Sequence, residues 1–185
     1  RRTLKSADVL GINYELNKLD DAHHLSRNKV LLISEMSNNP FTFRGDTNAE
    51  IDQVMDIEKD LAIFESKQFV SGSCLWSFND YATNRKNRFF RHCGVIDAWR
   101  IPKLSATYIK ARFSKDPYIS LHANWSSINK TMLRKINIFT NCKEVILYID
   151  DQSVSTLQGK WHMQTEVKFE PKILRAQGRL GNIRV

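Results

Sequence analysis

The sequence predicts an α/β region followed by an all-β region, with the change near residue 115. Before that point, short apolar runs alternate with helix-like stretches, which favours parallel strands joined by helices. After Asp116-Pro117, short β-rich segments follow one another at close spacing, which is typical of a small sandwich. We therefore expect two domains, 1–115 and 116–185.

Three apolar runs in the first region are predicted to be strands. Residues 9–14 form a short run, and residues 30–34 (VLLIS) are apolar up to the final serine. A continuous run of this kind is typical of a strand that is covered on both faces. The third run lies within 69–78, around Cys74, Leu75 and Trp76.

Helix-like stretches separate these strands. Residues 50–68 carry apolar side chains at steps of three and four residues, which would place them on one helix face. Residues 46–48 (Asp-Thr-Asn) offer candidates for the N-cap. Shorter helix-like stretches cover 16–25 and 105–112. The predicted apolar stripe consists of Val54, Ile57, Leu61 and Phe64.

The second region contains the pattern of a small β-sandwich. Residues 161–169 alternate between apolar and polar side chains, which indicates a strand with one buried and one solvated face. Asp150-Asp151 suits a hairpin tip. The remaining short β-rich runs are 118–121, 135–139, 145–149 and 173–176.

Composition excludes several classes of protein. The chain has 185 residues, 42% of them apolar, which is enough for a folded core and far from the disordered class. No apolar run approaches the roughly 18 residues of a membrane span. Residues 1–6 are polar and show no signal-peptide pattern. The compartment stays open, with a periplasmic or secreted location slightly favoured.

A net charge of +8 raises the hypothesis of a nucleic acid or another acidic polymer as partner. The basic residues are scattered and no nucleic-acid-binding motif is present, so we expect no nucleic-acid partner. One dense cluster stands out in a polar loop, and it is either a solvated loop or an anion contact for a substrate or partner. It consists of Arg85, Lys86, Arg88 and Arg91.

The cysteines Cys74, Cys93 and Cys142 fit no zinc motif, and their number is odd for a disulfide framework. We interpret them as buried or partly buried free thiols. No metal ion or other cofactor is expected.

Candidate functional residues follow the predicted strands. In a parallel α/β barrel, functional groups collect at the carboxyl ends of the strands. Glu35 directly follows a buried run, so its carboxylate can be held rigidly and partly desolvated, as a nucleophile or general acid requires. The alternative is a structural carboxylate bonded to a local arginine or amide. Asn13 and Tyr14 end the first strand, and Tyr14 could donate to a carboxylate or a substrate hydroxyl, or simply pack at the rim.

The third strand contributes a second group of candidates. Trp76 is either a core aromatic or a flat platform for the apolar face of a sugar. Asp80 follows it at the same rim, and His92 lies near that loop and could contact a ligand.

Five segments, in this order, resemble glycoside hydrolase family 2, with the closest match to the bacterial β-galactosidase-like branch. They are ADVLGINYE (7–15), LISE (32–35), GSCLWSFNDY (72–81), GVIDAWRIPK (94–103) and NCKEVILYID (141–150).

The resemblance implies the last three β/α units of a (β/α)8 barrel and an immunoglobulin-like β-sandwich. It implies that Glu35 is the catalytic nucleophile, with Tyr14 beside it, Trp76 lining the glycone site and Asn13 at the rim. The reaction would be retaining hydrolysis of β-glycosides, with β-galactosides first and glucuronides or mannosides as the nearest alternatives. A non-catalytic carbohydrate-binding or structural fragment is the rival hypothesis.

One part of the family pattern is missing. The general acid/base of the family is a Glu in an Asn-Glu pair, and this chain has no such pair. We therefore expect the isolated chain to be inactive or nearly so, with the N-terminal remainder of the enzyme as its partner. A homo-oligomer stays an open alternative.

Overall fold

The computed structural model describes residues 6–126 and 133–185. Residues 1–5, which belong to the segment without a signal-peptide pattern, lie outside the described residues. The chain divides into two compact units, Arg1–Ser105 and Ala106–Val185. The boundary predicted at 115/116 follows helix α4 (Leu104–Phe113), whereas this division falls in the first turn of that helix.

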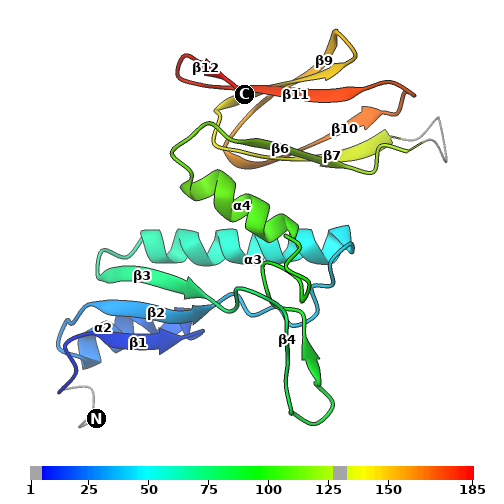
Figure 1. Cartoon of the computed structure of the whole chain (residues 1–185). Coiled ribbons are helices and arrows are strands. Elements are labelled where there is room, and N and C mark those ends of the chain that lie inside the picture. Colours follow the sequence, from blue (N-terminus) through cyan, green and yellow to red (C-terminus); the bar gives the residue numbers. More distant parts are fainter. Residues whose placement is uncertain (1–5, 127–132) are drawn as a thin grey trace. The chain divides into compact units, whose positions relative to one another are not determined.

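A parallel three-stranded sheet with the strand order β1-β2-β3 lies in the first unit (Figure 1). The chain enters helices between the strands, so the predicted alternation of strand and helix is confirmed. The elements are β1 (Leu10–Asn13), the 3-10 turn η1 (Leu16–Lys18), α2 (Leu19–Leu25), β2 (Leu31–Met36), α3 (Thr47–Glu65) and β3 (Val70–Leu75).

Strand β2 is covered on one face in the described chain, which corrects the prediction that both faces are covered. Leu31 and Ile33 are fully buried, whereas Leu32 between them is 37% exposed. Successive side chains of a strand point to opposite faces of the sheet. The continuous apolar run therefore includes a face that the described residues leave open.

Helix α3 begins where its N-cap residue, Asp46, binds the first free amides. The Asp46 carboxylate accepts from the backbone N–H of Asn48 and Ala49, each at 3.1 Å. The four residues of the predicted apolar stripe are all buried. The same face also buries Glu50, whose two oxygens accept from the amides of Gly45 and Leu104, both at 2.6 Å. The helix thus anchors the loop that precedes it and the start of α4.

The segment between β3 and α4 is irregular but tightly bound. It contains a short antiparallel pair, β4 (Tyr81–Ala82) and β5 (Phe90–Arg91). Isolated bridges join Ile96 to Asn79 and to Pro102. At Gly94, a Cβ atom would lie 2.2 Å from the carbonyl carbon of Asn79, so only glycine permits this approach of two backbone segments.

The second unit is a sandwich of two antiparallel sheets. One sheet has the order β10-β7-β6 and the other the order β12-β11-β8-β9. Residues of both sheets form one buried cluster, including Ile138 and Met163 from the first sheet and Val145 and Leu147 from the second. The strands are β6 (Ile119–Ala123), β7 (Leu133–Thr140), β8 (Glu144–Ile149), β9 (Gln152–Gln158), β10 (Trp161–Lys168), β11 (Leu174–Leu180) and β12 (Ile183–Arg184).

Local predictions for this unit are confirmed. Met163 and Val167 of β10 are buried, while Gln164, Glu166 and Lys168 are exposed, as the alternation indicated. The β8–β9 hairpin turns at Asp150-Asp151, and Asp150 has a left-handed φ of 51°.

The cysteines are free, and Cys93 and Cys142 are buried as expected. Cys74 is exposed, which corrects the prediction for it, because it lies on β3 at the edge of the three-stranded sheet. No helix of the described residues is long and apolar enough to cross a membrane.

Candidate active site

The carboxylate of Glu35 is held by two donors at the carboxyl edge of the parallel sheet. Asn13 Nδ2 donates to Glu35 Oε1 at 2.8 Å, and the Tyr14 hydroxyl donates to Oε2 at 2.5 Å. Asn13 is also the register partner of Glu35 between β1 and β2. Neighbouring parallel strands end at the same edge of a sheet. Three of the predicted residues, Asn13, Tyr14 and Glu35, therefore lie in contact there.

The orientation of Asn13 is set by a residue that the sequence analysis did not single out. Ser34 Oγ donates to Asn13 Oδ1 at 2.5 Å and lies 3.2 Å from the carbonyl oxygen of Ile12. Since the amide oxygen of Asn13 is engaged by this hydroxyl, its NH2 group is left for Glu35. Ser34 precedes Glu35 on β2, so the strand supplies both the carboxylate and the group that orients its donor.

Tyr14 is a constrained residue. It has a left-handed φ of 58°, a conformation that is uncommon for residues other than glycine, and its backbone N–H donates to the carbonyl of Glu35 at 3.0 Å. Burial, the hydrogen bond to Glu35 and the negative charge of that carboxylate raise the pKa of the Tyr14 phenol well above its usual value. The hydroxyl therefore stays protonated and continues to act as a donor.

A second layer of bonds reaches Tyr14 from the loop after β2. Asn38 Nδ2 lies 3.5 Å from the Tyr14 hydroxyl, and Arg91 donates to Asn38 Oδ1 at 2.7 Å. Arg91 is 5% exposed, and its Nε atom has no hydrogen-bond partner among the described residues. The sequence placed Arg91 in a basic loop, and nothing in its local pattern indicates that it turns inward toward Asn38.

Trp76 occupies the end of β3 and is 37% exposed. Its indole N–H donates to the Tyr81 hydroxyl at 3.0 Å, and the two rings meet edge-on. Its backbone N–H donates to the carbonyl of Met36, which ties the ends of β3 and β2 together. The indole is thus oriented by Tyr81 and keeps a partly open surface, and it forms no hydrogen bond with Glu35 in the described part of the chain.

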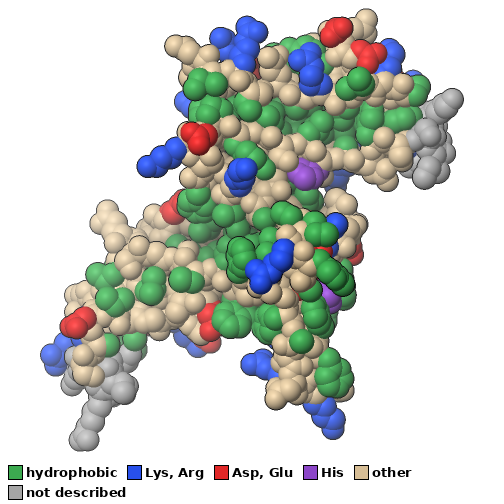
Figure 2. All heavy atoms as spheres, in the orientation of Figure 1, with side chains coloured by type: hydrophobic (Ala, Val, Ile, Leu, Met, Phe, Trp, Pro, Cys, Tyr) green, Lys and Arg blue, Asp and Glu red, His purple; other side chains and the backbone are tan. Residues whose placement is uncertain are grey.

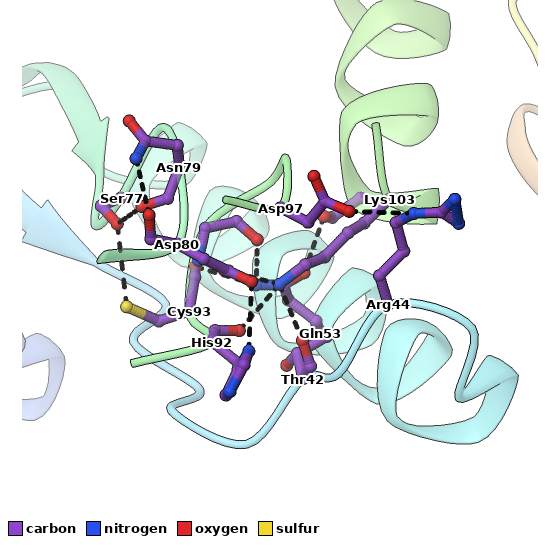
Figure 3. A network of polar contacts seen from close by, with 12 residues as sticks. Thr42, Arg44, Gln53, Ser77, Asn79, Asp80, His92, Cys93, Asp97 and Lys103 are labelled. Carbon is purple, nitrogen blue, oxygen red and sulfur yellow. Dashed lines mark hydrogen bonds and ion pairs between the residues drawn. The ribbon is translucent and has the colours of Figure 1, made fainter. Parts of the chain in front are cut away.

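Asp80 belongs to a buried polar network (Figure 3). It is 3% exposed, and its Oδ1 accepts from Lys103 Nζ at 2.7 Å and from the Gly94 amide at 2.9 Å. Lys103 is itself 1% exposed and also donates to the carbonyls of Thr42 and His92. We interpret Asp80 as a residue that braces loops, and the substrate contact that the sequence suggested for it stays a prediction.

His92 joins this network through the second carboxylate oxygen of Asp80. Its Nδ1 lies 3.2 Å from Asp80 Oδ2, and its ring packs between Phe43 and Phe90, with ring centroids 4.1 and 4.9 Å away. The imidazole is therefore fixed in place by Asp80 and the two phenylalanines. No group of three or more metal-ligating side chains occurs among the described residues.

The Glu35 cluster can hold a carboxylate at one position. Two donors, one on each oxygen, restrict the rotation of the carboxylate. These are requirements for a side chain that attacks an electrophilic carbon.

Comparison with curated proteins identifies glycosidases. A β-glucuronidase of Formosa agariphila is 30% identical over 95 residues, which cover 49% of this chain and 9% of that protein. A β-galactosidase of Thermoanaerobacter pseudethanolicus is 23% identical over 165 residues, which cover 83% of this chain and 22% of that protein. No family model matches the chain.

Solved structures show the same fold. Bacteroides uniformis β-glucuronidase 2, covalently bound to cyclophellitol-6-carboxylate aziridine, aligns with a TM-score of 0.72 and 21% identity over 96% of this chain and 25% of its own. A glycosyl hydrolase family 2 member from Bacteroides cellulosilyticus aligns with a TM-score of 0.68 and 18% identity over 96% of this chain and 24% of its own.

These comparisons confirm the resemblance that the motifs predicted. The chain is similar, in sequence and in fold, to the C-terminal part of family 2 glycoside hydrolases. It spans between 9% and 22% of the length of the curated relatives it matches. These relatives are named as both β-glucuronidases and β-galactosidases.

Proposed function

We propose that this chain supplies the nucleophile half of a retaining β-glycoside hydrolase site, with Glu35 as the nucleophile. In this proposal the parallel sheet is the last three units of a (β/α)8 barrel, and the sandwich is the immunoglobulin-like domain that follows it. The single observation that carries the proposal is the Glu35 carboxylate, held by Asn13 and Tyr14 at the carboxyl edge of the sheet.

The reaction proceeds by two displacements. Glu35 attacks the anomeric carbon and forms an ester bond to the sugar, while the glycosidic C–O bond breaks and an acid outside this chain protonates the leaving oxygen. Water, deprotonated by the same group, then attacks the anomeric carbon and releases the Glu35 carboxylate. Asn13 and Tyr14 hold Glu35 in line for attack, and the partly exposed Trp76 indole offers a surface for the sugar ring.

The leaving-group acid must come from elsewhere in the full-length enzyme. Retaining glycosidases place their two carboxyl groups about 5–5.5 Å apart. The Glu35 carboxylate is bonded by an amide and a phenol, and this sequence contains no Asn-Glu pair to match the acid/base motif of the family. In this function the chain therefore supplies one of the two catalytic carboxyl groups.

Covalent labelling tests the role of Glu35. The full-length protein should be incubated with 2-deoxy-2-fluoro β-galactoside and, in parallel, with the β-glucuronide, followed by peptide mass spectrometry. We expect one sugar on the peptide that contains Glu35, and the sugar that labels identifies the glycone. The β-galactoside is our first choice, and the names of the relatives support both sugars equally.

Substitution supplies the matched control. Glu35→Gln should lower kcat on the order of 10⁴-fold or more, because the amide cannot form the ester intermediate. Glu15→Gln, an exposed carboxylate two residues from Asn13, should leave kcat unchanged. A folded full-length protein that turns over substrate normally after Glu35→Gln would refute the assignment and favour the non-catalytic carbohydrate-binding role.

A further inference from the structure

A pocket of about 720 Å³ lies in the first unit, and neither Glu35 nor its two donors line it. Three exposed aromatic side chains line it: Phe43 is 49% exposed, Phe90 is 41% exposed and Trp99 is 81% exposed. Aromatic faces in a pocket of this size suit the apolar face of a sugar ring. The pocket is therefore shaped for a ring-bearing ligand.

Two polar side chains of the pocket are held in fixed positions. His92 is clamped between Phe43 and Phe90 and bonded to Asp80. Arg44 uses Nε to donate to Asp97 Oδ2 at 3.0 Å, and its side chain remains 41% exposed. Asp97 also accepts from the amide of Trp99 at 2.9 Å, so one carboxylate positions both Arg44 and the tryptophan loop. The terminal nitrogens of Arg44 remain for a ligand.

A basic hairpin leads to the pocket wall at Phe90. Arg85, Lys86 and Arg88 lie in the exposed loop between β4 and β5, and Figure 2 shows basic side chains at the end of this projection. Among the residues that the structure describes, none of the three forms an ion pair. Residues 83–89 contain no acidic side chain, so the loop carries an uncompensated positive charge.

Strand β5 connects this pocket with the Glu35 cluster. Phe90 and His92 line the pocket, whereas Arg91 between them donates to Asn38, which in turn lies 3.5 Å from the Tyr14 hydroxyl. Successive residues of the segment 90–92 therefore contact the pocket and the candidate active site. A saccharide chain with one unit at Glu35 would have this pocket and the basic loop as neighbours.

We propose that the pocket and the basic hairpin form a subsite for acidic sugar units, so that the substrate is an oligosaccharide carrying carboxylate or sulfate groups. The aromatic residues stack on the sugar ring, while Arg44 and the cations of the hairpin bind the anionic groups. The assignment of this ligand as substrate rests on the proposed function, whereas the binding itself does not.

Binding should be measured on the full-length protein carrying Glu35→Gln, by isothermal titration with three probes. Trigalacturonate carries carboxylates, a carrageenan tetrasaccharide carries sulfates, and galactotriose of the same linkage as trigalacturonate is neutral. We expect at least one acidic probe to bind roughly tenfold more tightly than galactotriose in about 0.05 M salt, with the difference shrinking as salt rises. The probe that binds more tightly identifies the anionic group.

Variants locate the site. Replacing Arg85, Lys86 and Arg88 together by Gln should lower the affinity for the acidic probe roughly tenfold and leave the affinity for galactotriose unchanged. Trp99→Ala, which removes an 81% exposed side chain, should lower the affinity for both the acidic probe and galactotriose. The matched control replaces Lys143, Lys168 and Arg179, three exposed cations of the second unit, by Gln and should change neither.

Two results would overturn the subsite. One is equal affinity for acidic and neutral probes, and the other is an equal loss of affinity in the control triple variant, which would mean non-specific charge attraction. Because the titration needs no turnover, a protein that binds the acidic probe but is never labelled at Glu35 refutes only the proposed function. A protein that is labelled at Glu35 but shows no preference for acidic probes refutes only the subsite.

Discussion

Glu35 depends on side chains that are distant from it in the sequence. Tyr14 is 21 residues away and Asn13 is 22 residues away, yet both bond its carboxylate because parallel strands bring their ends together. Ser34 orients Asn13, and Asn38 approaches Tyr14 from the next loop. Each of these groups fixes the direction in which the next one donates, which is what a positioned nucleophile requires.

The protonation of Tyr14 can be tested directly. Its pKa is raised above the ordinary value near 10.0, so its phenol should remain protonated at a pH where exposed tyrosines are half ionised. Near that pH, the tyrosinate absorbance of the wild type and of Tyr14→Phe should therefore be the same. If Tyr14 titrated normally, the variant would lose the contribution of one half-ionised tyrosine among the five in the chain.

The reactivity of Glu35 should depend on the same hydroxyl. Tyr14→Phe removes one donor and should lower kcat/KM by roughly 10²-fold, the effect of losing a single catalytic hydrogen bond. The free energy of unfolding should change little, because the phenyl ring retains the packing. Steady-state kinetics and denaturant unfolding of the same preparation would separate the two effects, and an unchanged kcat/KM would mean that the bond is only structural.

At the scale of elements, the irregular segment after β3 is held by one buried ion pair. Lys103 binds Asp80 and the carbonyls of Thr42 and His92, so a single ammonium joins the loop after β2, the β4–β5 hairpin and the start of α4. Gly94 completes this packing because its neighbours leave no space for a Cβ atom. Of the residues that line the pocket, Phe43 follows Thr42 in the sequence and His92 is itself bonded to Lys103.

Lys103→Met should destabilise the first unit by about 3–5 kcal/mol, because it leaves the Asp80 carboxylate buried without its cation. Urea unfolding would measure the loss. Lys67→Met is the matched control, since Lys67 pairs with an exposed Asp20, and it should cost about 1 kcal/mol or less. Equal losses in the two variants would contradict the structural importance assigned to the buried pair.

At the scale of the whole molecule, the chain joins a mixed α/β unit that carries the candidate site to a sandwich with its own core. Family 2 relatives include this fold within much longer chains, of which the present one spans at most 22% for the curated proteins. In the proposed function, the acid that completes the catalytic pair comes from sequence outside these 185 residues.

The isolated chain should therefore have no measurable glycosidase activity, whereas the full-length enzyme should be active on the same aryl glycoside. Release of the aryl group, followed at equal protein concentrations, would check this expectation. Turnover by the isolated chain at a rate near that of the full-length enzyme would show that the acid lies within these 185 residues and would require a new assignment.

The periodic segments of the chain were predictable, and so was the position of Glu35. The stripe of α3, the alternation of β10 and the turn at Asp150 depend on residues close together in sequence, and each is present in the structure. The resemblance to family 2 enzymes likewise depended on short contiguous motifs. Asn13, Tyr14 and Glu35 could be grouped because the strand-end rule needs only the order of the strands.

By itself, the sequence thus determined the order of the elements, the class of enzyme the chain resembles and the residues at the strand ends. Only the tertiary structure decided which side chains bond to which. Asp80 bonds to Lys103. Arg91, at the end of the basic loop, donates to Asn38, which is 53 residues away in the sequence. The reason is physical: side-chain periodicity encodes local conformation, whereas the partners of buried polar groups depend on how irregular loops meet in space.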